Sequence, residues 1–227
     1  INVSSAGTLL SFMEKPNFKM SFGFAQYCAE GNLCGDTIKT INDSRGHMVF
    51  IISDGMGKGS RAALDGAMGA GLLSKLLSAG FGFDSSLKVV NSALLVKSHE
   101  ESLATLDCVR VDLFSGKCEF YKAGAPRSYI VKDDRLTKCE LTSMPAGILR
   151  GVEFAKRTTV LNTDDEIIMM SDGVTDVGNE WLEKFLRLET TLEPNEKAKA
   201  ILKIALENSD EKHRDDMSVI VAKMIER

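Results

Sequence analysis

Two short stretches of the sequence place an aspartate directly after an apolar run. Val49–Gly59 reads VFIISDGMGKG, with Asp54 and Gly55 at its turn, and Glu166–Asp176 reads EIIMMSDGVTD, with Asp172 at the same point. The glycine that follows each aspartate lets another part of the backbone approach closely. Asp-Gly is also a common hairpin dipeptide, so either stretch alone is most simply a turn.

Two further acidic points change this interpretation. Asp36, in CGDT, is expected after a strand, and Asp215 and Asp216, in HRDDMSVIV, directly precede a closing apolar run. Clustered carboxylates repel one another unless cations lie between them, and an oxygen-only site without cysteine or histidine suits Mg²⁺ or Mn²⁺. Two such ions, about 3.5–4 Å apart, can activate a water molecule and hold a phosphoryl group, so no covalent enzyme intermediate is needed. Taken alone, the Asp215-Asp216 pair would more simply be a solvated loop.

Three motifs in this order, ISDGMGKG, MSDGVTD and RDDMSVIV, resemble those of the metal-dependent PP2C-type (PPM) protein serine/threonine phosphatases. AGAPRSYIV and MPAGIL are similar to the bacterial branch of that family, whose members control sigma factors, and in particular to its sporulation phosphatases. The resemblance covers nearly the whole chain. The three acidic motifs are specific as a set, whereas any one of them alone is not.

The resemblance implies an α+β fold in which a central antiparallel β-sandwich is flanked by helix pairs, with two Mn²⁺ or Mg²⁺ ions in a cleft at one edge. Asp54 would bridge the ions and the Gly55 carbonyl would bind one of them. Asp172 and Asp215 would complete the shell of the other ion, and Asp36 would act directly or through water. The catalytic residues would be Asp36, Asp54 and Asp172.

The same resemblance implies a protein serine phosphatase that acts on a phosphorylated anti-sigma-factor antagonist and so promotes sigma-factor activation in sporulation. It also implies an upstream regulatory domain, and it is compatible with a homodimer. The alternative is a catalytically weak or inactive PP2C-like binding or regulatory module. The presence of all four candidate acids, Asp36, Asp54, Asp172 and Asp215, argues against this alternative.

The chain departs from the family pattern at two positions beside Asp54. Met56 stands where eukaryotic members carry a histidine, so that general acid is missing, and Lys58 stands where the bacterial branch often has one. Two other phosphate-handling classes fit less well. GMGKGS lacks the Gly-Lys-Ser/Thr of a P-loop, and a haloacid-dehalogenase-type phosphatase would need a second aspartate at the position of Met56.

Hydrophobic periodicity predicts the elements that must position these residues. Strands are expected at Phe18–Ala29 and His47–Ser53, joined by the polar turn NDSRG, and helices at Lys58–Ala79 and from Asp84, as the N-cap, to Lys97. A hairpin around Ser115-Gly116 and another in RSYIVKDDRLTKCEL should follow. The later elements are strands in EFAKRTTVL, EIIMMSD and MSVIVAKMI, and helices at Glu180–Glu189 and Asn195–Asn208. We expect one PP2C-like domain over residues 1–227.

The first helix is unusually rich in glycine, and two interpretations of it stay open. Gly66 and Gly69 lie in its interior, where each glycine lowers helix stability by roughly 0.5–1 kcal/mol relative to alanine. Either the small residues let the helix pack closely on a sheet, or they let it move between two packings. Movement would change the geometry of the adjacent Asp54-Gly55 turn.

Composition excludes several other classes of protein. The formal charge of −4 and the absence of a basic stripe argue against nucleic-acid binding. Five cysteines without a C-x-x-C pair indicate reduced thiols, and neither a zinc site nor a disulfide scaffold. Because the chain begins at Ile1, we expect a fragment of a longer protein at the cytoplasmic face, with any membrane tether in an upstream segment.

Overall fold

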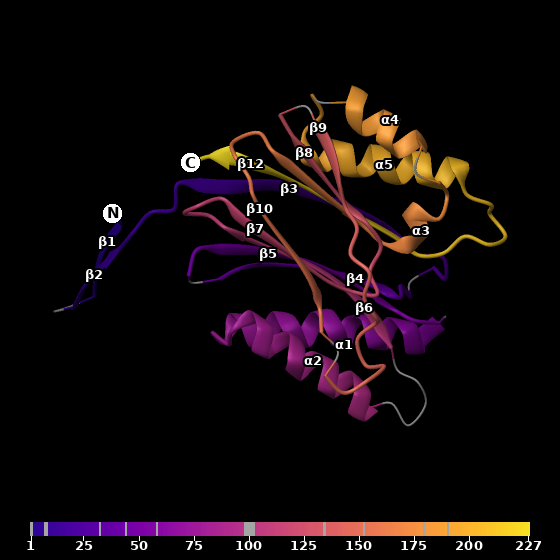
Figure 1. Cartoon of the computed structure of the whole chain (residues 1–227), viewed down its shortest axis with the longest axis horizontal. Helices are drawn as coiled ribbons and strands as arrows, with labels where there is room; N and C mark the ends of the chain where they lie inside the picture. Colours follow the sequence, from indigo (N-terminus) through magenta and orange to yellow (C-terminus); the bar gives the residue numbers. More distant parts are fainter. Residues whose placement is uncertain are drawn as a thin grey trace.

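The structure of the chain is a computed structural model that describes the backbone of residues 2–6, 9–31, 33–43, 45–57, 59–97, 103–133, 135–151, 153–178, 180–189 and 191–227. Side chains are described from residue 14 onward. The body of the molecule consists of two antiparallel sheets between two layers of helices (Figure 1). This arrangement confirms the predicted α+β sandwich.

Sheet I has five strands in the order β10-β7-β6-β5-β4. Its strands are β4 (Asp36–Asn42), β5 (His47–Gly55), β6 (Ala104–Asp112), β7 (Lys117–Ala123) and β10 (Ala155–Val160). The interior strand β5 reads as a continuous apolar run because both of its faces are covered. Val49 and Ile51 pack toward the helices, whereas Phe50 and Ile52 pack toward the second sheet.

Sheet II has five strands in the order β3-β12-β11-β8-β9. They are β3 (Phe18–Tyr27), β8 (Ser128–Lys132), β9 (Arg135–Cys139), β11 (Glu166–Met170) and β12 (Met217–Glu226). A separate hairpin of β1 (Asn2–Ala6) and β2 (Leu9–Met13) extends away from the body at the N-terminal end (Figure 1).

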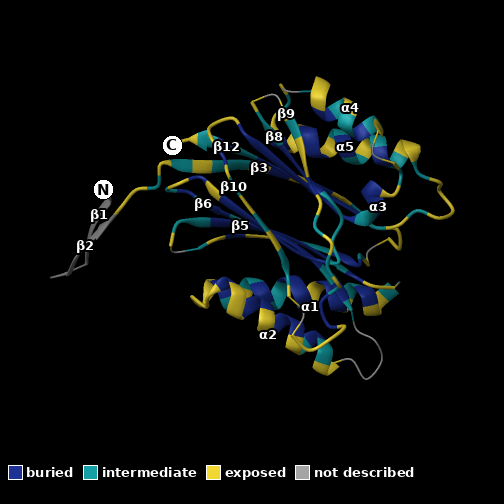
Figure 2. Cartoon of the chain, in the orientation of Figure 1, coloured by how far each residue is buried: buried dark blue, intermediate teal, exposed yellow. Residues whose placement is uncertain are grey.

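The helices cover the outer faces of the sandwich (Figure 1). Packed on sheet I are α1 (Gly59–Ser78) and α2 (Phe83–Lys97); over sheet II lie α3 (Asp172–Thr175), α4 (Glu180–Leu188) and α5 (Pro194–Asn208). Three apolar clusters result, one under each helix layer and one between the sheets. The central strands are accordingly buried, and the exposed residues gather on the helices and loops (Figure 2). No described helix is long and apolar enough to cross a membrane.

Most of the predicted elements are confirmed, and the differences are local. The strand β4 was missed, so NDSRG joins β4 to β5 instead of following β3 directly. As a result Asp36 is the first residue of a strand, not the residue after one. The helix α2 begins at Phe83, which places Asp84 in its first turn and not at its cap. The described cysteines are free thiols, as expected, and three of them are buried.

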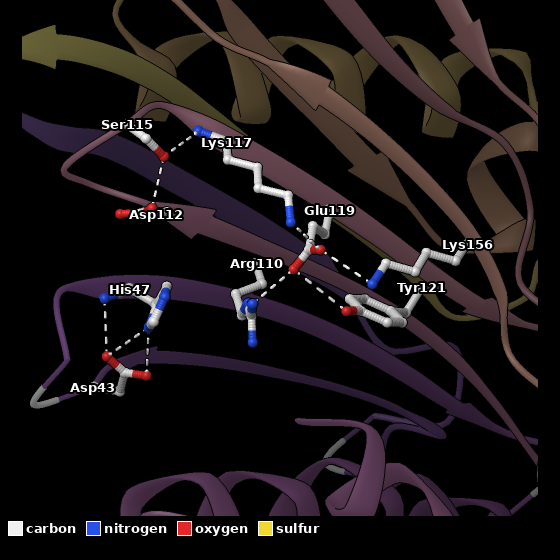
Figure 3. Close-up of polar contacts among 9 residues, drawn as sticks. All are labelled: Asp43, His47, Arg110, Asp112, Ser115, Lys117, Glu119, Tyr121 and Lys156. Carbon is white, nitrogen blue, oxygen red and sulfur yellow. Dashed lines mark hydrogen bonds and ion pairs between the residues drawn. The ribbon is translucent and has the colours of Figure 1, made fainter. Parts of the chain in front are cut away.

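The outer face of sheet I carries a charged cluster around Glu119, which is 3% exposed (Figure 3). Its carboxylate contacts Arg110 Nη2 at 2.8 Å, Lys117 Nζ at 2.9 Å and Lys156 Nζ at 3.1 Å. Burial opposes its ionisation, but the hydrogen bonds from these lysines lower the pKa of Glu119 to about 2. The cluster therefore joins β6, β7 and β10 through one buried anion.

Candidate functional site

The pairing of β4 with β5 brings the first two candidate acids together. Asp36, the first residue of β4, lies directly opposite Asp54, near the end of β5, in the antiparallel register. Asp36 is only 3% exposed, and neither of its carboxylate oxygens has a hydrogen-bond partner among the described residues. A buried carboxylate without a partner is costly, and a bound cation is one way to satisfy it.

Sheet II approaches the same edge. Gln26 Nε2, on β3, donates to the Asp36 carbonyl at 3.1 Å and to Ser218 Oγ at 3.1 Å, which ties β4 to β12. Burial raises the pKa of Asp36 to about 6, although the hydroxyls of Ser171 and Ser218 oppose this rise. Neither hydroxyl is in hydrogen-bonding geometry with the carboxylate. Asp36 is thus located at the seam between the two sheets.

Asp54 has a raised pKa to which four other carboxylates contribute. Burial and the neighbouring acids, of which Asp36 contributes most, raise the pKa of Asp54 to about 8. The acids that act on it are Asp36, Asp172, Asp215 and Asp216. Four carboxylates, one on β4 and three in the turns next to strands of sheet II, therefore act electrostatically on Asp54.

The other acids are supplied by two turns in contact with each other. Asp172 is the first residue of α3, where its Oδ1 accepts the Gly173 N–H at 2.8 Å. A Cβ on Gly173 would lie 2.1 Å from the Asp216 carbonyl oxygen, so only glycine permits this approach. Burial and the charges of Asp176 and Asp215 raise the pKa of Asp172.

Asp216 is the residue that sequence reasoning left out of the site. Its carboxylate accepts the N–H groups of Ala29 at 2.7 Å and Gly35 at 2.5 Å, whereas exposed Asp215 accepts the Asp216 N–H at 2.8 Å. Asp216 therefore fixes the loop before β4, and Asp215 is open to solvent. The doublet Asp215-Asp216 was visible in the sequence, but nothing in it indicated which carboxylate would face the loop.

Gly55 is required by its surroundings. Its N–H donates to the Gly35 carbonyl at 3.2 Å, and a Cβ on it would lie 1.9 Å from the Ala62 carbonyl oxygen of α1. The turn is therefore wedged between α1 and the Gly35 loop. Met56 follows it with 47% of its surface exposed, and Lys58 lies outside the described residues.

A cavity of about 190 Å³ opens at Asp215 and Asp216. Its lining includes Gly35, Asp215, Asp216, Gly57, Gly59 and Ala62. A larger open hollow of about 630 Å³ along α5 shares Glu211 and Arg214 with this cavity but contains none of the candidate metal ligands. The volume of a cavity therefore does not identify the site, whereas the presence of Asp215 among the lining residues does.

The two basic residues next to Asp215 differ in their surroundings. Arg214 donates to Ser209 Oγ at 2.7 Å and to the Leu206 carbonyl at 2.9 Å, and it stacks over the ring of Tyr27. It thus braces the loop before β12. His213 is exposed and contacts Asp210 Oδ2 at 2.8 Å, pointing to a local role in the same loop.

In the described part of the chain, no three Asp, Glu, His or Cys side chains converge into a ready-made ligand cage. The strand register nevertheless places Asp36 opposite Asp54. The unpartnered oxygens of Asp36 and the raised pKa of Asp54 are consistent with further acids close to this pair. Asp36, Asp54, Gly55, Asp172 and Asp215 stay a predicted ligand set.

Comparison with known proteins gives the family. Residues 44–225 match the model of the family described as stage II sporulation protein E (SpoIIE). The chain is 28% identical over 222 residues to stage II sporulation protein E of Bacillus subtilis (strain 168), covering 95% of this chain and 27% of that protein. It is 31% identical over 200 residues to the Priestia megaterium protein, covering 86% of this chain and 34% of that protein. The chain thus spans about a quarter to a third of these relatives.

Solved structures show the same fold. The PP2C phosphatase domain of Bacillus subtilis SpoIIE, solved with a fragment of its regulatory domain, has a TM-score of 0.85 and 27% identity over 94% of this chain and 64% of that chain. The catalytic domain of the serine/threonine phosphatase PstP, solved with two manganese ions, shares the fold at a TM-score of 0.73 and 19% identity, covering 92% of this chain and all of that chain. With a family model that matches most of its length, this chain belongs to the stage II sporulation protein E family.

Proposed function

We propose that this chain is a metal-dependent protein serine phosphatase with a single PP2C-like domain. The observation that carries the proposal is the cross-strand pair of buried Asp36 with half-buried Asp54, in which both oxygens of Asp36 lack a hydrogen-bond partner among the described residues. The charges of Asp172, Asp215 and Asp216, in the turns next to the strands of sheet II, contribute to the raised pKa of Asp54. An all-oxygen donor set of this kind fits Mn²⁺ or Mg²⁺.

In this proposal Asp36, Asp54 and Asp172, with Asp215 and the Gly55 carbonyl, hold two divalent cations. When bound, such ions polarise a phosphoryl oxygen and lower the pKa of water, which supplies the nucleophile. The residues of the chain have the remaining tasks. Sheet I fixes Asp36 and Asp54 in register, and Asp216 fixes the Gly35 loop. The cavity lined by Gly35, Asp215 and Asp216 would take the phosphoserine side chain.

A cysteine nucleophile is the chemical alternative, because Cys28 and Cys34 are near the site and partly exposed. Burial, a hydrogen bond with Cys28 and the charge of Asp216 all raise the pKa of the Cys34 thiol well above its usual range. A thiol with a raised pKa is mostly protonated at neutral pH and therefore a poor nucleophile. This favours the metal-dependent mechanism.

The proposed substrate is a phosphoserine on an anti-sigma-factor antagonist, whose dephosphorylation would promote sigma-factor activation in sporulation. Membership of the SpoIIE family and the similarity to its PP2C phosphatase domain support this assignment. The relative's structure includes part of a regulatory domain, which supports an upstream regulatory domain here as well. A homodimer and a membrane tether outside this chain belong to the same proposal.

The test is hydrolysis of p-nitrophenyl phosphate and of a phosphoserine protein with Mn²⁺, with Mg²⁺ and with EDTA. Activity should require a divalent cation, and Asp54→Ala should lower turnover by roughly 100-fold or more. Asp164→Asn is the matched control, because Asp164 precedes the opposite end of β11 and pairs with Lys223. Full activity in EDTA, or in folded Asp54→Ala, would exclude the mechanism. A folded wild-type chain that binds Mn²⁺ without turning over either substrate would favour the binding-module alternative.

A further inference from the structure

Among the described residues, two lysines have almost no exposed surface, Lys122 at 0% and Lys197 at 1%. The ammonium of Lys122 donates to three oxygens, Asp107 Oδ2 at 2.7 Å, Ser128 Oγ at 2.8 Å and the Pro126 carbonyl at 2.6 Å. Ser128 Oγ also donates to Asp107 Oδ2, at 2.9 Å. Nothing in the proposed mechanism uses this buried cation.

The network lies in sheet I, on the strands β6 and β7 that follow β5 in the strand order. Asp107 pairs with Lys122 across β6 and β7, and it lies two residues from Thr105, which pairs with Asp54. Since side chains two apart on a strand share a face, Asp107, Thr105 and Asp54 all point between the sheets. The Asp54 N–H also donates to Thr105 Oγ1, at 3.4 Å. The start of β6 therefore connects the network to Asp54.

A second connection runs through two loops. Ser143 Oγ donates to the Lys122 carbonyl at 2.8 Å and accepts the Gly124 N–H at 3.2 Å. Three residues later, Ala146 forms two backbone hydrogen bonds with Ala104, at 2.9 and 3.2 Å. Ala104 in turn pairs with Gly55, the predicted carbonyl ligand. Hydrogen bonds and the strand pairs of β6 thus connect Lys122 to both Asp54 and Gly55.

Stability alone is a poor reason for this arrangement. A buried ion pair is often matched or exceeded in stability by apolar residues of similar volume. An apolar side chain could not, however, hold the carboxylate of β6, the hydroxyl of β8 and the carbonyl of the Pro126 loop at one point. The ammonium therefore joins three segments at one point, and the hydrogen bond from Ser128 Oγ to Asp107 Oδ2 completes the junction of β6 with β8.

We propose that Lys122 is a positioning residue of the metal site. Its ammonium fixes the start of β6 and the 124–127 loop, and its carbonyl fixes the 143–146 loop, so that Asp54 and Gly55 keep the geometry that binds the cation. This inference rests on the proposed function. It assigns to Lys122 no contact with the substrate or with the metal.

The test measures the Kd of Mn²⁺ by isothermal titration calorimetry, and thermal unfolding checks that each variant is folded. Lys122→Met should raise the Kd of Mn²⁺ by roughly 10- to 100-fold, the usual effect of losing a residue that orients metal ligands. Lys197→Met is the matched control. Lys197 is equally buried and pairs with Glu166 at 2.6 Å, at the end of β11 remote from Asp172. It should lose thermal stability while its Kd for Mn²⁺ stays within twofold of the wild-type value.

If Lys122→Met does not fold, Ser128→Ala and Ser143→Ala each remove one connection and leave the ion pair in place. Both should raise the Kd severalfold. Wild-type Kd in folded Lys122→Met, or in both serine variants, would overturn the inference, as would an equal rise in Lys197→Met. Asp54→Ala separates this result from the proposed function: if it binds Mn²⁺ as the wild type does, the metal site itself is wrong.

Discussion

At the scale of single residues, the site is defined by carboxylates that are held in an unfavourable environment. Asp36 and Asp54 are paired across two strands and surrounded by further acids, and burial is the largest cause of their raised pKa values. Residues kept in this state without an internal partner are more often functional than structural. The first prediction follows from their titration.

Without metal, the thermal stability of the chain should fall as the pH rises through the pKa values of Asp36, about 6, and Asp54, about 8. Both values lie above 3.8, the ordinary value of the carboxyl group, so the folded state binds these protons more tightly than the unfolded state does. Their stabilising contribution is therefore complete below about pH 3.8 and is lost as the pH increases to 8.

The measurement is the melting temperature in EDTA between pH 5 and 8.5, for the wild type and for Asp54→Asn. The variant cannot ionise at position 54, so its melting temperature should fall less steeply above about pH 6. Saturating Mn²⁺ should flatten the wild-type curve. Parallel curves for the two proteins in EDTA would show that Asp54 has an ordinary pKa.

Thiols should be dispensable for turnover. Cys28→Ser and Cys34→Ser are expected to keep their metal-dependent activity, because burial keeps the Cys34 thiol protonated and the proposed nucleophile is water. Buried Cys108→Ser is the contrast, with an expected loss of stability of about 1–3 kcal/mol and unchanged turnover per folded molecule. Turnover and chemical unfolding of the three variants provide the test. Complete inactivity of a folded Cys28→Ser or Cys34→Ser variant would point to thiol chemistry.

At the scale of elements, α1 is pressed against the strands that carry the site. A Cβ on Gly66 would lie 2.1 Å from the Gly35 carbonyl oxygen, and one on Gly69 would lie 2.7 Å from Ser53 Oγ. Gly35 in turn bonds to Gly55 and to Asp216. These contacts support the close-packing interpretation of the glycines, and they also show how a displacement of α1 would reach the ligands.

Gly66→Ala should lower stability by about 1–3 kcal/mol, because the new methyl group meets backbone that cannot move freely. Gly71→Ala is the matched control on the same helix. Among the described residues no atom would lie within 4 Å of a Cβ added there, so the variant should gain roughly 0.5–1 kcal/mol from helix propensity.

The Mn²⁺ concentration that gives half-maximal activity distinguishes close packing of α1 from movement of α1 between two packings. If the helix controls the ligands, Gly66→Ala should shift the Mn²⁺ midpoint at nearly constant saturated turnover, while Gly71→Ala should not. A lower melting temperature with an unmoved midpoint would mean that the glycines serve packing alone.

At the scale of the whole molecule, the candidate site joins the two halves of the sandwich. Sheet I provides Asp36 and Asp54, and the turns of sheet II provide Asp172 and Asp215. A cation bound by both sheets would stabilise the folded state and not the unfolded chain, in which the four acids are far apart.

Mn²⁺ at 100 times its Kd should therefore add about 2.7 kcal/mol to the free energy of unfolding. For a chain of this size that is a rise in melting temperature of roughly 5–10 °C. Asp172→Ala removes a ligand from sheet II and should abolish most of the rise, whereas Asp164→Asn should retain it. Thermal unfolding with and without Mn²⁺ measures the effect, and an equal rise in Asp172→Ala would mean that the cation binds elsewhere.

The amino-acid sequence by itself determined most of the elements, since long apolar runs and helical spacing are local signals. The hairpin of β6 and β7 around Ser115-Gly116, the helix α5 and the closing strand β12 were all predicted. The acidic motifs also pointed to a metal-dependent phosphatase fold through family resemblance, and the comparisons confirm the family.

Tertiary structure decided which residues meet. The strand β4 reads DTIKTIN, and its mixed polarity at a sheet edge conceals it, so the pairing of Asp36 with Asp54 could not be predicted. The role of Asp216 and the burial of Lys122 were hidden for the same reason. Each depends on contacts between segments distant in the chain, and periodicity carries information only about neighbours within one element. Local pattern thus determined the elements, and long-range packing determined the site.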